Sequence, residues 1–280
     1  MSRQQNKNEI IIVPQGGIAN RMRAMMSAYT LAQSLGRRLR ILWVENEELH
    51  CSFPDIFAIN NDLYSVESIS NFKHLFAFLP PLKKNLFLSP LFRLFKNRHY
   101  IFQIGKNVIF PTREQWLKEY DNQDIVIVSG SSFFDYDPGS INSVFPISDK
   151  VAKREKEIVM NQMPQIAFHI RRTDNTLAIK HSPLELFENA LERELTNNSD
   201  ALFFLATDDE TIKNKFVQKY PHNIICNPNP AVRSTCDGIV DGMAELEILS
   251  KCEIIYGSYW SSFAEIASQK NGNRLVVLKT

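Results

Sequence analysis

Residues 165–174 read Gln-Ile-Ala-Phe-His-Ile-Arg-Arg-Thr-Asp, a short apolar run that leads directly into two guanidiniums and a carboxylate. Apolar runs of β-prone residues predict buried strands. Open α/β sheets bind ligands beyond the carboxyl ends of their strands, and arginine is the side chain best suited to hold phosphate oxygens bidentately. The stretch therefore predicts an anionic, phosphorylated ligand at this strand end. The alternative is a solvated loop in which arginine and aspartate pair.

Downstream of this stretch, predicted strands and helices alternate to the last residues. Strands are expected at 202–206, 223–226, 252–256 and 274–278. Helix starts are expected at Ser182-Pro183 with capping-box spacing, at Thr207 as N-cap, and at Ser261-Ser262. This rhythm predicts a parallel, doubly wound sheet. The loops at 169–174, 207–209 and 257–262 would then leave strand ends along one edge and share one ligand.

The first half carries a second strand–turn–helix–strand unit. An apolar strand at 9–13 is followed by Gly16-Gly17, a helix with apolar positions at helical spacing, and another strand at 39–44. The glycines allow a sharp turn, and the helix start offers free N–H groups to an anion. Asn20, Arg21 and Arg23 fall in the first helical turn, where cations oppose the helix dipole. A bound anion would offset the unfavourable interaction of these cations with the helix dipole. The alternative is that the long side chains extend away from the helix start into solvent.

Length and charge limit the class of protein. The chain has 280 residues, 44% of them hydrophobic, which suits two domains of roughly 100–200 residues each. We place the boundary near residue 150, giving domains at 1–150 and 151–280. The net charge of +1 argues against a dedicated nucleic-acid binder, because such a protein carries a basic excess.

The sequence predicts a soluble protein of a reducing, cytoplasmic setting. The first residues lack a secretory apolar region, and no apolar stretch approaches the roughly 20 residues that span a bilayer. The cysteines form neither a CxxC pair nor a zinc spacing, so we expect buried or incidental thiols; they are Cys51, Cys226, Cys236 and Cys252.

Residues 72–102 alternate phenylalanine with lysine and arginine. One interpretation is a basic, aromatic surface that contacts a membrane or a lipid-linked acceptor, which would place the protein at the inner face of the membrane. The favoured interpretation is that the aromatic residues face a core and the cations are solvated.

Two acidic clusters invite a chemical interpretation. Asp208-Asp209 could suggest a metal, but their expected place in a first helical turn has a structural explanation, so no metal site is predicted. The carboxylates at 45–48 follow the strand at 39–44 and could supply an acid or base. An ordinary polar loop has the same composition.

Several segments resemble the GDP-fucose-dependent fucosyltransferases. Residues 16–23 and 169–174 are similar to signature segments of the α-1,6-fucosyltransferases of N-glycan cores and nodulation factors; protein O-fucosyltransferases are more distant. The likeness extends in order to the segments 206–209, 233–249 and 258–264. It covers the second half of the chain and one motif in the first half.

The resemblance implies a GT-B-like α/β fold, with two Rossmann-like doubly wound domains facing a cleft. It also implies an inverting, metal-independent glycosyltransferase that takes GDP-fucose as donor and a glycan or lipid-linked saccharide as acceptor. Arg171 would hold the β-phosphate, His169 would approach the nucleotide, and Asp241 is the candidate for guanine. The remaining residues assigned to the GDP-sugar are Gly16, Gly17, Asn20, Arg21, Arg23, Arg172, Asp208, Arg233, Ser261 and Ser262.

The chain departs from this family at the general base. The α-1,6 enzymes of N-glycan cores carry a glutamate shortly after the arginine motif, whereas residues 176–180 here contain no carboxylate. The base would then be Asp174, or Glu45, Glu47 or Asp55. Two alternatives remain open: the same fold with another nucleotide-sugar donor, and a non-catalytic nucleotide- or glycan-binding relative.

Overall fold

The computed structural model describes residues 8–69, 98–102, 110–119, 124–160, 162–173 and 175–280. The chain divides into two compact units. The first unit comprises Met1–Glu48 and Ile59–Tyr136, and the second comprises Leu49–Ala58 and Asp137–Thr280.

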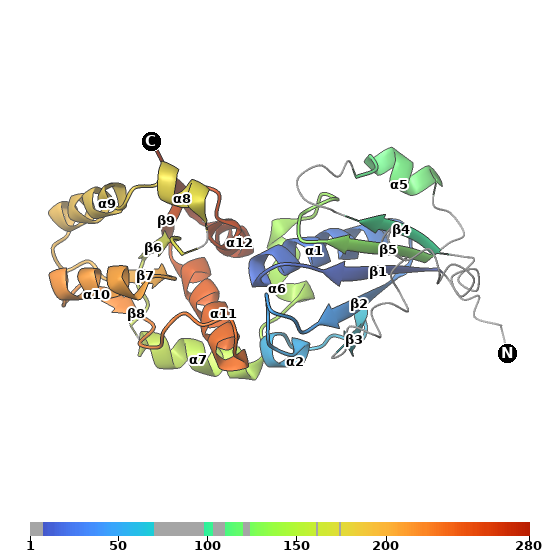
Figure 1. Cartoon of the computed structure of the whole chain (residues 1–280), viewed down its shortest axis with the longest axis horizontal. Helices are drawn as coiled ribbons and strands as arrows, with labels where there is room; N and C mark the ends of the chain where they lie inside the picture. Colours follow the sequence, from blue (N-terminus) through green and yellow to red (C-terminus); the bar gives the residue numbers. More distant parts are fainter. Residues whose placement is uncertain (1–7, 70–97, 103–109, 120–123, 161, 174) are drawn as a thin grey trace. The chain divides into compact units, whose positions relative to one another are not determined.

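The first unit contains a five-stranded sheet of order β3-β2-β1-β5-β4 (Figure 1). All of its pairings are parallel. Its strands are β1 (Glu9–Pro14), β2 (Arg38–Val44), β3 (Tyr64–Ile69), β4 (Arg98–Phe102) and β5 (Asp124–Ser129). The helices among its described residues are α1 (Ile18–Ser34) and α5 (Arg113–Glu119). The apolar run of β1 is buried throughout instead of alternating, as expected for a central parallel strand covered on both faces.

The second unit contains a five-stranded parallel sheet of order β10-β9-β6-β7-β8. Its strands are β6 (Ile166–Ile170), β7 (Phe203–Thr207), β8 (Ile224–Cys226), β9 (Ile254–Ser258) and β10 (Arg274–Leu278). Its helical segments are α2 (Phe53–Ile56), η2 (Pro138–Ser140), α6 (Ile141–Val144), α7 (Asp149–Val159), α8 (Thr176–His181), α9 (Leu184–Asn197), α10 (Glu210–Lys219), α11 (Cys236–Lys251) and α12 (Ser262–Asn271). The predicted α/β class with doubly wound, parallel sheets is confirmed. The cleft between the domains stays a prediction.

In both sheets the order in which the chain adds strands reverses beside the central strand. In the second sheet the chain moves from β6 outward to β8 and returns to the other side of β6 as β9. In the first sheet the equivalent neighbours are β1 and β5. Loops that follow the two strands of such a switch point diverge and leave a crevice, where open α/β sheets bind ligands. The arginine motif follows β6, and Gly16-Gly17 follows β1.

The observed division differs from the predicted boundary at residue 150. Residues 137–148 belong with the second unit because η2 and α6 pack against α12. The segment Leu49–Ala58 belongs there too, although it lies early in the chain. Ser148 explains part of this, because its hydroxyl donates to the backbone carbonyl of Asp55 (2.7 Å). Such contacts between distant residues leave no local signal in the sequence.

Two of the predicted helix starts need correction. Ser182 does not cap α9; its hydroxyl donates to the Leu278 carbonyl and accepts the N–H of Tyr259 (2.8 Å). Thr207 lies inside β7, and the N-cap of α10 is Asp209, whose carboxylate accepts two backbone N–H groups. The predicted start at Ser261-Ser262 is confirmed.

The thiol prediction is wrong for one pair of cysteines. Cys51 and Cys236 form a disulfide with a Cα–Cα distance of 4.3 Å across 185 residues of sequence, because α2 packs against α11. Cys226 and Cys252 are free thiols, and Cys252 is buried. No helix among the described residues combines the length and apolar character needed to cross a membrane. The membrane interpretation of 72–102 falls largely outside the described residues.

Candidate active site

The strand-end cluster of the second unit is organised around Asp208, which directly follows β7. Its carboxylate accepts the backbone N–H of Arg172 (2.8 Å) and both the N–H (3.3 Å) and hydroxyl (2.7 Å) of Thr173. It also forms an ion pair with Arg171, whose Nη1 lies 2.7 Å from Oδ2. Asp208 therefore fixes the loop after β6 and the direction of the Arg171 side chain. The resemblance assigns Asp208 to the donor, whereas its observed bonds are to this loop.

The electrostatics of Asp208 favour its charged form. Burial acts to raise the pKa of this carboxyl, but the Thr173 hydroxyl, the Arg171 guanidinium and the Arg172 N–H together hold it below the usual value. Arg171 thus meets a permanent anion at neutral pH. Because guanidinium has several N–H donors in a planar fork, one ion pair can orient it without using all of its donors.

Arg171 is also anchored through its backbone. Its N–H donates to the hydroxyl of Ser258 at the end of β9 (2.9 Å). The carboxyl ends of β6, β7 and β9 are thereby tied together around one guanidinium. The sequence predicts that these three loops lie along one edge of the sheet. The contacts of Arg171 with Asp208 and Ser258 show that they do.

Arg172 plays a different part from its neighbour. Its side chain is buried: Nη2 donates to the Ser182 carbonyl (2.7 Å), Nη1 donates to the Arg171 carbonyl (3.2 Å), and the guanidinium lies over the Phe187 ring. Burial lowers its pKa, and Asp208 and Asp209 oppose that effect. Its observed partners are backbone carbonyls that shape the loop, and its contact with the donor stays a prediction.

His169 lies at the end of β6, buried against α12. Its Nδ1 is 3.2 Å from the hydroxyl of Ser261, and its ring stacks on Phe263 with centroids 5.0 Å apart. Burial lowers the pKa of His169 to about 4, aided by Arg171 and opposed by Asp208. The ring is therefore neutral at physiological pH and can hold a hydrogen bond without adding positive charge.

The start of α12 contributes the two serines. Ser261 is the buried N-cap residue, and Ser262, the first helical residue, is partly exposed. Helix N-termini present backbone N–H groups and a positive dipole end to anions. Ser261 links this helix start to His169, so both belong to the cluster around Arg171.

Asp241 belongs to α11, and Arg233 belongs to the loop before that helix. Asp241, on α11, is buried, pairs with Arg154 of α7, and accepts the amide of Asn229 (3.0 Å). Arg233 is exposed in the loop before α11. That loop passes so close to the helix that a Cβ at Gly238 would overlap the Val232 carbonyl oxygen. The predicted guanine contact of Asp241 would have to compete with its bonds to Arg154 and Asn229.

The glycine turn of the first unit is organised by Arg21. This side chain is fully buried at 0% exposure. Its Nε donates to the Gly16 carbonyl (2.8 Å), Nη1 to the Val44 carbonyl (2.7 Å) and Nη2 to Asn46 Oδ1 (2.9 Å). Burial lowers its pKa to about 10, opposed by Glu48. Arg21 therefore joins the loops after β1 and β2, and its contact with an anion stays a prediction.

The other predicted residues of this turn surround Arg23. Gly16 has a φ of +81°, which glycine adopts without strain, and a Cβ there would lie 2.9 Å from the Asn20 amide. Asn20 Oδ1 accepts from Nη2 of Arg23 (2.7 Å), whose Nε donates to the Gly130 carbonyl (3.2 Å) after β5. Gly17 is the N-cap of α1. Asn20 and Arg23 thus lie at the β1/β5 switch point of the first sheet.

The candidates for a general base fall in different places. Glu45 and Glu47 are exposed after β2 in the first unit. Asp55 belongs to the second unit, where it accepts the Ser52 hydroxyl (2.6 Å) and pairs with Lys150 (3.5 Å). Asp174 lies outside the described residues.

Two other features are structural in character. Over the described ranges, the one group of side chains with metal-ligand geometry is Cys51, Asp55 and Cys236, and its cysteines are joined as a disulfide.

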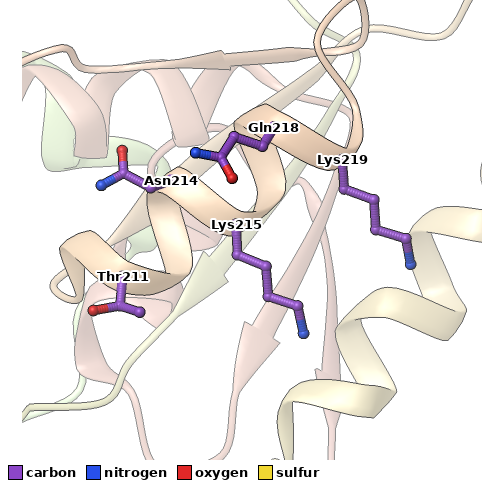
Figure 2. Close-up of a pocket in the computed structure, with 5 residues that line it drawn as sticks. All are labelled: Thr211, Asn214, Lys215, Gln218 and Lys219. Atoms are coloured by element: carbon purple, nitrogen blue, oxygen red, sulfur yellow. The ribbon is translucent and has the colours of Figure 1, made fainter.

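A surface hollow of about 680 Å³ lies on α10 (Figure 2). Its lysines, Lys215 and Lys219, pair with Glu188 and Glu192 of α9, so the hollow belongs to the packing between these helices. Its lining is Thr211, Asn214, Lys215, Gln218 and Lys219.

Sequence reasoning missed the polar residues that hold the site together. Asn175 caps α8 through its Oδ1, which accepts the Ala178 N–H (3.0 Å), and donates its amide to the Trp260 carbonyl (3.1 Å). Asparagine before a short helix is a recognisable N-cap signal. The roles of Thr173 and Ser258 had no such signal, because each depends on a partner dozens of residues away.

Comparisons with known proteins agree with this description of the fold. No protein-family model matches the chain, and no curated protein matches it. Among solved structures, fucosyltransferase NodZ from Bradyrhizobium is 15% identical, with a TM-score of 0.61 over 94% of this chain and 93% of that one.

Two further matching structures were determined with GDP-fucose. NodZ alpha-1,6-fucosyltransferase soaked with GDP-fucose matches at 15% identity and a TM-score of 0.59, over 94% of this chain and 92% of that one. POFUT1 in complex with GDP-fucose matches at 12% identity and a TM-score of 0.60, over 99% of both chains. The resemblance to fucosyltransferases is thus confirmed at the level of the fold.

Proposed function

We propose that this chain is an inverting fucosyltransferase that moves fucose from GDP-fucose to the hydroxyl of a glycan or lipid-linked saccharide. The observation that carries the proposal is the cluster at the β6/β9 switch point, where Arg171, His169 and Ser261 are held together by the ends of parallel strands. The shared fold of donor-bound fucosyltransferases supports the choice of donor.

Arg171 has the chemistry to stabilise the leaving group. The acceptor oxygen attacks the anomeric carbon from the face opposite the diphosphate, and the bond to the β-phosphate oxygen breaks with its electron pair. Negative charge then grows on GDP. A guanidinium fixed in place beforehand stabilises that charge without reorganisation, and the ion pair with Asp208 supplies the fixing. This cation does the work of a metal ion, so the proposed reaction needs none.

Different residues are proposed to bind the nucleoside and the phosphates of the donor. The N–H groups at the start of α12, with Ser261 and Ser262, suit the phosphates, and neutral His169 suits a hydrogen bond to the nucleoside. Asp241 and Arg233 are the proposed guanine-side residues. Gly16, Gly17, Asn20 and Arg23 offer a second anion-binding turn on the first unit.

The proton of the acceptor hydroxyl needs a carboxylate base. Asp174 is our first candidate because it follows the arginine motif, and Glu45 is the second because it is exposed beyond β2. The predicted cytoplasmic location stays a prediction. The Cys51–Cys236 disulfide weighs against it, since disulfides persist in oxidising compartments.

Calorimetry against GDP, UDP and ADP, followed by a transfer assay with GDP-fucose, tests the proposal. We expect selective binding of GDP, and we expect Arg171→Ala to lower transfer by at least about 10²-fold. Arg274→Ala is the matched control, since it removes an exposed arginine at the start of β10. Both variants should keep the circular dichroism of the parent.

Three results would redirect the proposal. Selective binding of another nucleotide would favour a different donor. Tight GDP binding without transfer to any saccharide in a broad acceptor panel would favour the non-catalytic alternative. Normal transfer by Arg171→Ala would remove the residue on which the mechanism depends.

A further inference from the structure

Trp260, between β9 and α12, combines two unusual properties. Its side chain is 57% exposed, and its φ is +59°. A positive φ is a genuine outlier for a bulky residue, and the exposed indole offers the face of an aromatic ring to a ligand. Backbone strain of this kind persists where the surrounding structure imposes it, and it gathers at functional sites.

The surrounding contacts hold the tryptophan in this conformation. Its carbonyl accepts the amide of Asn175 (3.1 Å), the residue that caps α8. The preceding residue, Tyr259, donates its N–H to the Ser182 hydroxyl (2.8 Å) and packs edge-on against His181. The backbone is thus fixed on both sides, while much of the indole remains accessible.

The position of Trp260 in the cluster suggests its ligand. The next residue is Ser261, the N-cap of α12, and consecutive Cα atoms are only about 3.8 Å apart. In the proposed function, the diphosphate lies at the start of α12 and at Arg171. The sugar is joined directly to the β-phosphate, so it is the next part of the donor beyond these groups. The nucleoside extends from the other phosphate.

A hexose ring suits an exposed indole. The face of a pyranose that carries several C–H bonds is apolar, and the aromatic π face carries the negative part of a quadrupole that attracts such hydrogens. We propose that Trp260 is the platform on which the transferred sugar of the donor stacks. This inference rests on the proposed function and adds to it a residue that recognises the sugar.

The test compares the dissociation constants of GDP and GDP-fucose by calorimetry without acceptor. In the parent protein we expect GDP-fucose to bind more tightly than GDP. Trp260→Gly should reduce that preference by about 2- to 12-fold, the range of an aromatic stacking contact, and leave the affinity for GDP unchanged. Trp260→Phe should keep most of the preference. Val217→Ala on α10, also partly exposed, is the control and should match the parent.

Glycine also separates binding from folding. It adopts positive φ without strain, so Trp260→Gly should keep or raise the Tm while it loses the sugar preference. An unchanged preference in Trp260→Gly, or an equal loss of affinity for both ligands, would refute the stacking role and leave the proposed function standing. In the transfer assay, a Trp260→Gly variant that differs from the parent only by a higher KM for the acceptor would assign the indole to the acceptor. That result would also refute the stacking role. Failure of the parent to bind GDP would refute the proposed function itself.

Discussion

Replacing Asp208 by asparagine should loosen the loop that carries Arg171. The carboxylate accepts bonds from Arg172 and Thr173 and pairs with Arg171. Hydrogen bonds to a charged group contribute about 1.5–3 kcal/mol each. The asparagine oxygen can keep one acceptor bond, whereas its NH₂ group would face donors. We therefore expect Asp208→Asn to lower the free energy of unfolding by about 2–4 kcal/mol, and the Tm by roughly 5–15 °C.

The pH dependence of this loss identifies its cause. The pKa of Asp208 is lower in the folded protein than in the unfolded chain, so its contribution is present above the unfolded value of about 3.9 and is lost as the pH falls through the folded value. The Tm difference between parent and Asp208→Asn should therefore be constant from pH 7 to about pH 5 and shrink below pH 4. Thermal unfolding by circular dichroism across this range measures it.

Activity decides what the ion pair does for Arg171. If Asp208 orients the guanidinium, Asp208→Asn should lower fucosyl transfer by about 10-fold or more, within the range of a misplaced catalytic group. Asp200→Asn is the control, because this exposed aspartate precedes the start of the same strand. Tighter GDP binding with an unchanged Tm would mean that Asp208 only competes with the ligand, and the reasoning would be refuted.

Further predictions concern single features of the two units. His169 should be neutral when folded, so stability should fall as the pH drops from about 6.5 to 4, and His169→Gln should flatten that slope in thermal unfolding. Arg21→Lys should lower the free energy of unfolding in urea by about 2–4 kcal/mol, since lysine cannot reach all three acceptors; a change below 0.5 kcal/mol would contradict the role given to Arg21. Reducing the Cys51–Cys236 disulfide should cost about 2–5 kcal/mol, seen as a lower Tm with dithiothreitol and absent in a double serine variant. Gly238→Ala should destabilise by about 1–3 kcal/mol through overlap with the preceding loop, whereas Gly242→Ala, where a Cβ meets nothing within 4 Å, should not.

The sequence by itself determined the α/β class, the main strands and the arginine motif at a strand end. Runs such as Ile10–Val13 and Ile166–Phe168 are apolar without alternation, which is a local property of buried parallel strands. Sequence order and the rule that parallel strands are joined by crossovers then brought the loops after β6 and β9 to one edge. Those features depend on neighbouring residues, and a single chain displays them.

Only the tertiary structure decided which partners each polar residue has. Arg171 and Arg172 are adjacent in sequence, yet the first pairs with Asp208 at the strand end and the second is buried against backbone carbonyls. Arg21, the Cys51–Cys236 disulfide and the strained Trp260 depend in the same way on partners distant in sequence. The cost of burying a charge or bending a backbone is met by contacts that exist only after the chain has folded, so local sequence patterns cannot reveal them.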